Sequence, residues 1–377
     1  MAAYISMPPK IHFHTLDALR FFAFFKVFLL HIPYEGNSQT ISFLKSGGGI
    51  GVTFFFVLSG FLITYILSYE KLHVGHINIK KFFLRRSFRI WPLFFLVVGI
   101  VAIIPYDIKQ ALGLHMIGNG YAFDWRYSFT FTENYKMLLE DNRPQTTPLS
   151  VFWSLCIEEH FYILWMLVIF LIPGKRIPLF LICSIIISWI ARYLEPGITH
   201  NERIVNQEIF TNLDNFAIGG LPAYFVAKNY ERVASFIRAI PSWIKYFYLM
   251  LAVIAVIFQT TVFPITNIMF LDILRPTFIA LLFVGIICVF IPQDSKIRIN
   301  DNSVLSKLGK ISYGLYVYHL IFIHIMFQFC KYLSIKIDDV WSLLLFSIIA
   351  LFLSIIISGI SYLFFEKKFM VLRERFN

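Results

Sequence analysis

Long apolar blocks constrain the fold of this chain more than any other feature. Each block has about 17 to 25 residues, the length at which an α-helix crosses the hydrocarbon core of a bilayer. Apolar residues make up 58% of the 377 residues and charged residues only 15%, whereas soluble domains are about half apolar and one-quarter charged. The sequence therefore predicts an all-α polytopic membrane protein with ten transmembrane helices, at residues 16–32, 49–69, 88–105, 149–172, 178–193, 209–226, 246–263, 271–291, 311–329 and 340–364.

The net charge of +11 is explained by topology rather than by an acidic partner. With the N-terminus in the cytoplasm, and with Arg89 and Arg192 counted in the segments that they border, the cytoplasmic segments hold 21 of the 33 Lys and Arg residues and the opposite side holds 9. This asymmetry is the positive-inside pattern, and it predicts that both termini are cytoplasmic. A nucleic-acid partner is then unnecessary. We expect a single transmembrane domain over residues 1–377 of a multi-pass protein of the inner membrane, with no cleaved signal peptide and no fused soluble domain.

The first predicted span contains two ionisable residues, Arg20 and His31. Their spacing of 11 residues is about three helical turns, so both side chains lie on one stripe, roughly 16 Å apart along the axis. An ionisable group inside a bilayer costs about 2.5–3.5 kcal/mol on insertion scales and usually marks a functional site. One interpretation is an anion-binding arginine with a proton-transferring histidine. The alternative is a pair that only hydrogen-bonds to neighbouring helices.

A basic cytoplasmic loop, Tyr69–Arg89, leads into the third predicted span and ends in Arg85, Arg86 and Arg89. Spacings of three and four residues place Arg89 on the same helical face as Arg85 or Arg86. Clustered guanidinium groups suit a polyphosphate, because each can bind two oxygens at once. Simple anchoring by positive charge is the alternative explanation.

Two consecutive carboxylates, Glu158 and Glu159, lie near the start of the fourth predicted span. On a helix they point about 100° apart, so they do not need a common partner. They either pair with cations of other spans, namely Arg20, Lys26 or Arg275, or take part in chemistry. In the second case, one orients a histidine and the other binds an acceptor hydroxyl.

The long extracytoplasmic connection at residues 105–148 is rich in aromatic side chains, among them Trp125. Loops of this length are usually functional or disordered, and so many aromatic residues argue against disorder. Aromatic faces beside Asp124 and Glu133 can hold a sugar. An aromatic belt at the membrane interface is the alternative.

Six short segments, in a fixed order, carry a resemblance to a known family. The first is Leu16–Arg20 (LDALR) with His31; the others are 54–64 (FFFVLSGFLIT), 85–92 (RRSFRIWP), 153–162 (WSLCIEEHFY), 311–319 (ISYGLYVYH) and 364–368 (FFEKK). Taken together they resemble the acyltransferase-3 family of integral membrane O-acyltransferases over nearly the whole chain. Three positions depart from residues that are common in that family, where Thr53, Cys156 and His160 replace Asp, Ser and Gln.

The resemblance implies transfer of an acyl group, commonly acetyl, from cytoplasmic acyl-coenzyme A to a hydroxyl of a cell-surface or exported carbohydrate. Acyl-coenzyme A is then the donor substrate, and its phosphates are expected to bind Arg20, Arg85, Arg86 and Arg89. The expected partners are this donor, a carbohydrate or lipid-linked glycan acceptor, and membrane lipids. The four cysteines lack metal-like spacing, and no metal is expected.

Within this reading, His31 acts on the acceptor hydroxyl as a general base or accepts the acyl group first, and Glu158 or Glu159 orients it. Contacts with the substrate are assigned to Asp17, Trp125, Trp153 and Tyr162. The rival interpretation is a secondary transporter of a lipid-linked sugar or small anion, which would use the intramembrane charges as a relay. Transporters often contain internal repeats, and the sequence has none that we detect.

Overall fold

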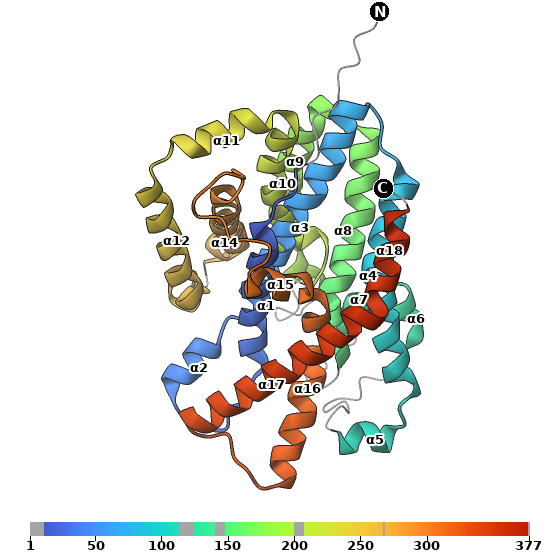
Figure 1. Cartoon of the computed structure of the whole chain (residues 1–377), viewed down its shortest axis with the longest axis vertical. Helices are drawn as coiled ribbons and strands as arrows, with labels where there is room; N and C mark the ends of the chain where they lie inside the picture. Colours follow the sequence, from blue (N-terminus) through green and yellow to red (C-terminus); the bar gives the residue numbers. More distant parts are fainter. Residues whose placement is uncertain (1–10, 113–123, 140–147, 200–206, 267, 376–377) are drawn as a thin grey trace, which may run out of the picture.

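Helices are the only regular secondary structure in the described part of the chain. The computed structural model describes residues 11–112, 124–139, 148–199, 207–266 and 268–375, and within these ranges it contains helices but no strand (Figure 1). Seven helical segments among the described residues are long and apolar enough to cross a membrane. The bent pair formed by α11 (Tyr230–Ala239) and α12 (Ser242–Ile257) makes eight if it is counted as one span. The protein is therefore a multi-pass α-helical membrane protein, as predicted.

Each predicted span coincides with a helix. These helices are α1 (Thr15–His31), α3 (Gly49–Tyr69), α4 (Ile79–Ile103), α8 (Phe152–Leu171), α9 (Ile177–Thr199), α10 (Leu213–Lys228), α12, α14 (Met269–Val289), α16 (Ser312–Tyr332) and α17 (Val340–Ser361). The shorter helices are α2 (Gln39–Lys45), η1 (Glu70–Val74), α5 (Tyr106–Ala111), α6 (Trp125–Phe129), α7 (Glu133–Leu139), η2 (Pro148–Val151), η3 (Gly174–Arg176), η4 (Phe210–Asn212), α13 (Gln259–Val262), α15 (Val304–Lys310), η5 (Tyr362–Glu366) and α18 (Lys367–Glu374).

The difference between ten predicted spans and seven long helices comes from three short ones. α1, α10 and α12 have 17, 16 and 16 residues. A helix of that length extends about 24–26 Å, less than the roughly 30 Å hydrocarbon core. Parts of two predicted spans fold as the separate helices η4 and α13, which shortens α10 and α12.

The centre of the molecule is α3, which contacts α1, α8, α10 and α14. Two glycines let the backbones of α3 and α10 approach closely. A Cβ atom on Gly60 would lie 2.1 Å from the carbonyl oxygen of Phe216, and one on Gly219 would lie 2.0 Å from that of Val57. Small residues at such a crossing allow the tight packing that joins helices within a membrane. This contact fixes the position of α3 relative to α10.

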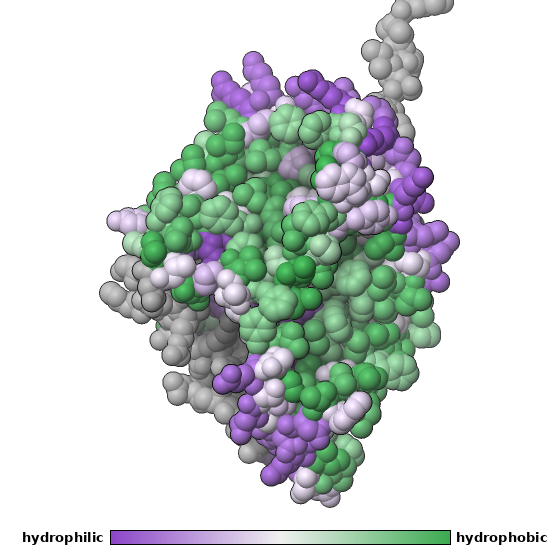
Figure 2. All heavy atoms as spheres, turned by 90° about the vertical axis from the view of Figure 1, so that its left-hand side faces the viewer, coloured by the Kyte–Doolittle hydropathy of each residue, from purple (hydrophilic) through white to green (hydrophobic). Residues whose placement is uncertain are grey.

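The remaining helices surround this centre (Figure 1). α4 packs against α6, α8 and α18, while α9, α11, α12 and α14 group around the other side of α10, and α16 pairs with α17. Figure 2 shows the side on which α12 lies. A broad apolar surface is bounded there by polar residues gathered at its two ends. This distribution is the one expected of a surface that faces lipid.

A buried ion pair ties α9 to α10 and α14. The guanidinium of Arg192 donates to Asp214, and the hydroxyl groups of Ser188 and Thr277 donate to the same carboxylate at 3.0 and 2.6 Å. The Arg192 and Asp214 side chains are only 3% and 0% exposed. The pair is a structural contact that joins these three helices.

Asp214→Ala should destabilise the protein by about 3–5 kcal/mol, because Arg192 would remain as an uncompensated buried charge. Thermal unfolding of the detergent-solubilised chain measures this effect. The control is Glu231→Ala, since Glu231 is 73% exposed in its ion pair with Arg238 and such pairs contribute about 0–1 kcal/mol. Equal unfolding temperatures for the two variants would show that the buried pair does not stabilise the bundle.

Candidate functional site

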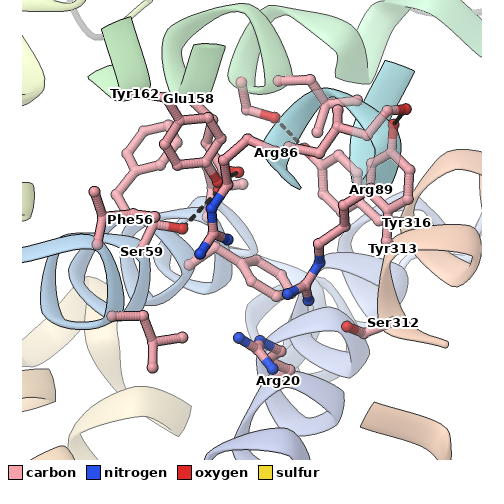
Figure 3. A pocket seen from close by; sticks show the side chains of 17 residues that line it. Arg20, Phe56, Ser59, Arg86, Arg89, Glu158, Tyr162, Ser312, Tyr313 and Tyr316 are labelled. Carbon is pink, nitrogen blue, oxygen red and sulfur yellow. Dashed lines mark hydrogen bonds between the residues drawn. The ribbon is translucent and has the colours of Figure 1, made fainter. Parts of the chain in front are cut away.

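A group of arginines lies where five helices meet (Figure 3). The residues surround a cavity of about 90 Å³. Its polar lining consists of Arg20 from α1, Ser59 from α3, Arg86 and Arg89 from α4, Ser154, Glu158 and Tyr162 from α8, and Ser312, Tyr313 and Tyr316 from α16. The cavity thus brings together residues from five of the six motifs that carry the family resemblance. Ser312, Tyr313 and Tyr316 come from the fifth of these, at residues 311–319.

The three arginines have different surroundings. Arg20 forms an ion pair with Asp17 one turn earlier on α1. The guanidinium of Arg86 lies over the rings of Phe82 and Tyr162, at 5.8 and 5.7 Å from their centroids. No carboxylate in the described part of the chain lies within 4 Å of the Arg89 guanidinium, which points into the same space as that of Arg20 in Figure 3. Arg89 therefore retains its capacity to bind an anion.

The two carboxylates of α8 point to different places, as their helical spacing predicts. Glu158 lines the cavity and accepts hydrogen bonds from the hydroxyl groups of Ser59 at 3.2 Å and Tyr162 at 2.8 Å. Glu159 does not line it. Its side chain is 4% exposed and accepts a hydrogen bond from the indole of Trp91 at 3.0 Å. Since Asp17 and Glu158 oppose three guanidinium groups, the site has an excess of positive charge.

His31 lies next to a second histidine, His319 of α16. Nδ1 of His31 is 3.0 Å from the carbonyl oxygen of Val27 and 3.3 Å from Nε2 of His319, while Nδ1 of His319 is 2.7 Å from the carbonyl oxygen of Tyr316. A carbonyl oxygen can only accept, so each ring carries a proton on Nδ1 when neutral. In this tautomer the basic nitrogen of His31 is Nε2. His319 is fully buried and contributes to holding the His31 ring in this orientation.

The arginine cavity does not include His31. The connection between the two runs through Tyr316, which lines the cavity and whose ring centroid lies 5.8 Å from that of His319. That Glu158 or Glu159 orients His31 stays a prediction, and neither carboxylate takes part in the contacts described above for His31. The contacts above join His31 to His319, and they join the two carboxylates to Ser59, Tyr162 and Trp91.

The other residues assigned from the sequence lie at varying distances from the cavity. Arg85 does not line it and pairs with Glu70 at 3.1 Å. Trp153 is partly buried, and its ring lies 6.5 Å from that of Phe56 in the cavity wall. Trp125, on α6, is 62% exposed and does not line it.

The described part of the connection at residues 105–148 is folded against the bundle. Residues 113–123 and 140–147 of this segment lie outside the described residues. The side-chain amide of Asn134 donates to the carbonyl oxygen of Gln207 at 2.9 Å, and the hydroxyl of Tyr135 donates to Glu208 at 3.2 Å. Burial raises the pKa of the Glu208 carboxyl, although the backbone N–H groups of Phe210 and Thr211 act in the opposite direction. These contacts attach α7 to the start of α10.

Sequence reasoning missed two residues of this region. The sequence alone predicts no chemical role for Ser59, whose hydroxyl lies in the cavity wall and donates to Glu158. The sequence also predicts no chemical role for His319, and the contact of this residue with His31 could not be foreseen. The two histidines are 288 residues apart in the chain, and only the packing of α1 against α16 brings them together.

The fold and the site define a multi-pass membrane protein whose interior offers guanidinium groups to an anionic ligand and holds a paired histidine nearby. The chain belongs to the acyltransferase-3 family, because the model of that family, described as an acyltransferase domain, matches residues 13–363. The resemblance drawn from the motifs is thereby confirmed.

Two relatives illustrate the likeness. The peptidoglycan O-acetyltransferase OatA of Listeria monocytogenes is 31% identical over 40% of this chain, and the O-acetyltransferase OatA of Staphylococcus aureus is 33% identical over 41% of it. The matched part corresponds to 23% and 24% of these relatives, so the chain spans about a quarter of their length. No solved structure matches this chain.

Proposed function

We propose that this protein transfers an acetyl group from cytoplasmic acyl-coenzyme A to a hydroxyl of a cell-surface or exported carbohydrate. The single observation that carries the proposal is the convergence of Arg20, Arg86 and Arg89 in one cavity of a chain from an acyltransferase family. The relatives named O-acetyltransferases support acetyl as the acyl group, and the one named for peptidoglycan supports a glycan acceptor, free or lipid-linked. In this proposal the chain crosses the inner membrane ten times, with both termini in the cytoplasm.

In this proposal, the arginines of the cavity bind the donor. A phosphate of coenzyme A binds Arg89, whose guanidinium has no carboxylate partner among the described residues, and Arg20 and Arg86 add charge beside it. The pantetheine arm then extends along α1 from Arg20 towards His31, a distance of roughly 16 Å on a helix. This span is comparable with the reach of an extended pantetheine arm.

His31 acts on the acceptor hydroxyl as the general base. Nε2 of this histidine takes the proton of the acceptor hydroxyl while the hydroxyl oxygen attacks the thioester carbonyl carbon. The new C–O ester bond forms, the C–S bond breaks, and the coenzyme A thiolate takes the proton from His31. His319 acts as a positioning residue, since it contacts Nδ1 rather than the nitrogen that accepts the proton.

Mass spectrometry of surface glycans tests this function in cells. Glycans from cells that make the protein should contain an alkali-labile acetyl ester that disappears when the gene is deleted and returns with the wild-type chain. The Arg85→Ala chain should also restore it, because Arg85 pairs with Glu70 outside the cavity. An unchanged glycan mass after deletion would contradict the proposal.

A further inference from the structure

A second cavity, far larger than the arginine cavity, lies between α10, α11, α12 and α14. It has a volume of about 890 Å³, within the roughly 300–1,000 Å³ typical of ligand pockets. α11 crosses one end of the molecule and α12 turns away from it at 90° (Figure 1). The bend leaves a space between α12 and α14 that the side chains of these helices do not fill.

Three cations from three helix ends line this cavity. Lys228 is the last residue of α10, Arg232 lies in the first turn of α11, and Lys245 lies in the first turn of α12. Among the residues that the structure describes, no acidic one lines the cavity. The nearby carboxylates Glu231 and Asp294 are both paired with Arg238, which does not line it.

Of the three cations, Lys245 gives the strongest evidence for a bound anion. Lys245 is only 8% exposed, and no carboxylate in the described ranges lies within 4 Å of its ammonium group. It also lies at a helix N-terminus, where the helix dipole disfavours a positive charge. A buried cation in this position is costly unless an anion compensates it.

Apart from Asn229 and Tyr248, the rest of the lining is apolar. Phe225, Ile240 and Val289 are examples, and Phe225 is 50% exposed. α12 lies on the side of the molecule that has the broad apolar surface of Figure 2. The cavity therefore combines a cationic end with an apolar body. Basic pockets of this kind between membrane helices bind the head groups of anionic phospholipids.

We propose that this cavity binds one anionic phospholipid, whose phosphate contacts Lys228, Arg232 and Lys245 and whose acyl chains fill the space between α12 and α14. The three cations lie in the connection that the positive-inside pattern assigns to the cytoplasm, so the lipid comes from the cytoplasmic leaflet. The lipid fixes α12, whose contacts with the bundle are mainly with α14. This site is separate from the arginine cavity and does not depend on the function proposed above.

The test uses the full chain, delipidated in non-ionic detergent, and measures thermal unfolding and, by native mass spectrometry, the phospholipids retained. Phosphatidylglycerol should raise the unfolding temperature and remain bound, whereas phosphatidylcholine with the same acyl chains should do so much less. Soluble glycerol 3-phosphate should have no effect. Equal effects of the two lipids, or an effect of the soluble phosphate, would overturn the proposal.

Variants locate the site. The triple variant Lys228→Gln, Arg232→Gln, Lys245→Gln should bind phosphatidylglycerol about 100-fold more weakly, because each cation near the phosphate contributes to the attraction. The matched control replaces three exposed cations elsewhere, Lys80, Lys175 and Lys368, by Gln and should keep wild-type binding. Loss of binding in the control, or its retention in the triple variant, would refute the site. Lys245→Arg, which keeps the charge, should retain the lipid, and loss of binding in this variant would also refute it.

Discussion

His31→Ala will reduce acyl transfer by about 10²- to 10⁴-fold, the contribution expected of a positioned general base. The effect should appear in kcat, because the arginines proposed to bind the donor lie outside the immediate surroundings of His31. Membrane insertion should be unchanged, since removing this ring leaves a cavity at one end of α1 and no unpaired charge. The measurement is label transfer from radiolabelled acetyl-coenzyme A in membranes that contain equal amounts of each variant.

Two further histidine variants make this prediction specific. His160→Gln is the control, because His160 stacks on Tyr135 at 5.5 Å and Gln is common at this position in the family. It should keep nearly full activity. His319→Ala should lower kcat less than His31→Ala and should alter the pH profile, because it removes a contact to Nδ1 of His31. An active, normally inserted His31→Ala protein would refute the assignment.

Arg89→Ala should raise the apparent KM for acyl-coenzyme A by about 10- to 100-fold. A hydrogen bond to a charged group contributes roughly 1.5–3 kcal/mol, and Arg89 has no carboxylate within 4 Å among the described residues that would compete for it. Steady-state kinetics over a range of donor concentrations measures the effect. The KM for the acceptor should change little, because this residue lies at the proposed donor end of the site.

Arg85→Ala is the matched control for this second prediction. Both residues are arginines on α4 and lie four positions apart, but Arg85 pairs with Glu70 at 3.1 Å outside the cavity. Its removal should change the KM for the donor by less than about threefold, because the Arg85 guanidinium contacts Glu70 and does not line the cavity. Equal effects of the two variants would mean that general surface charge, and not the cavity, attracts the donor.

The helices could be predicted from the sequence because a bilayer demands long apolar blocks, and every predicted span is helical in the structure. Their exact lengths could not be predicted. Hydropathy does not distinguish a continuous helix from one followed by a short separate helix, as at η4 before α10 and α13 after α12. The positive-inside pattern predicts the orientation, with both termini in the cytoplasm, and a topology experiment tests it.

The residue types of the site could also be predicted, because arginine and glutamate are costly in a membrane and therefore conspicuous. Which of them share a cavity depends on how each helix is rotated about its axis. Arg85 and Arg86 differ by about 100° on α4, and only Arg86 faces Arg20 and Glu158. The contact between His31 and His319 has the same origin, because it arises from the packing of α1 against α16.

The most direct test of the central claim follows the two halves of the donor separately. Membrane vesicles from cells that make the protein, and that retain the native glycan acceptor, are supplied with acetyl-coenzyme A labelled either in the acetyl group or in the coenzyme. We predict that only the acetyl label enters the glycan as an alkali-labile ester, and that His31→Ala and Arg89→Ala vesicles fail to incorporate it at low donor concentration. Absence of acetyl label from the glycan of wild-type vesicles would contradict the claim, as would undiminished labelling by the two variants.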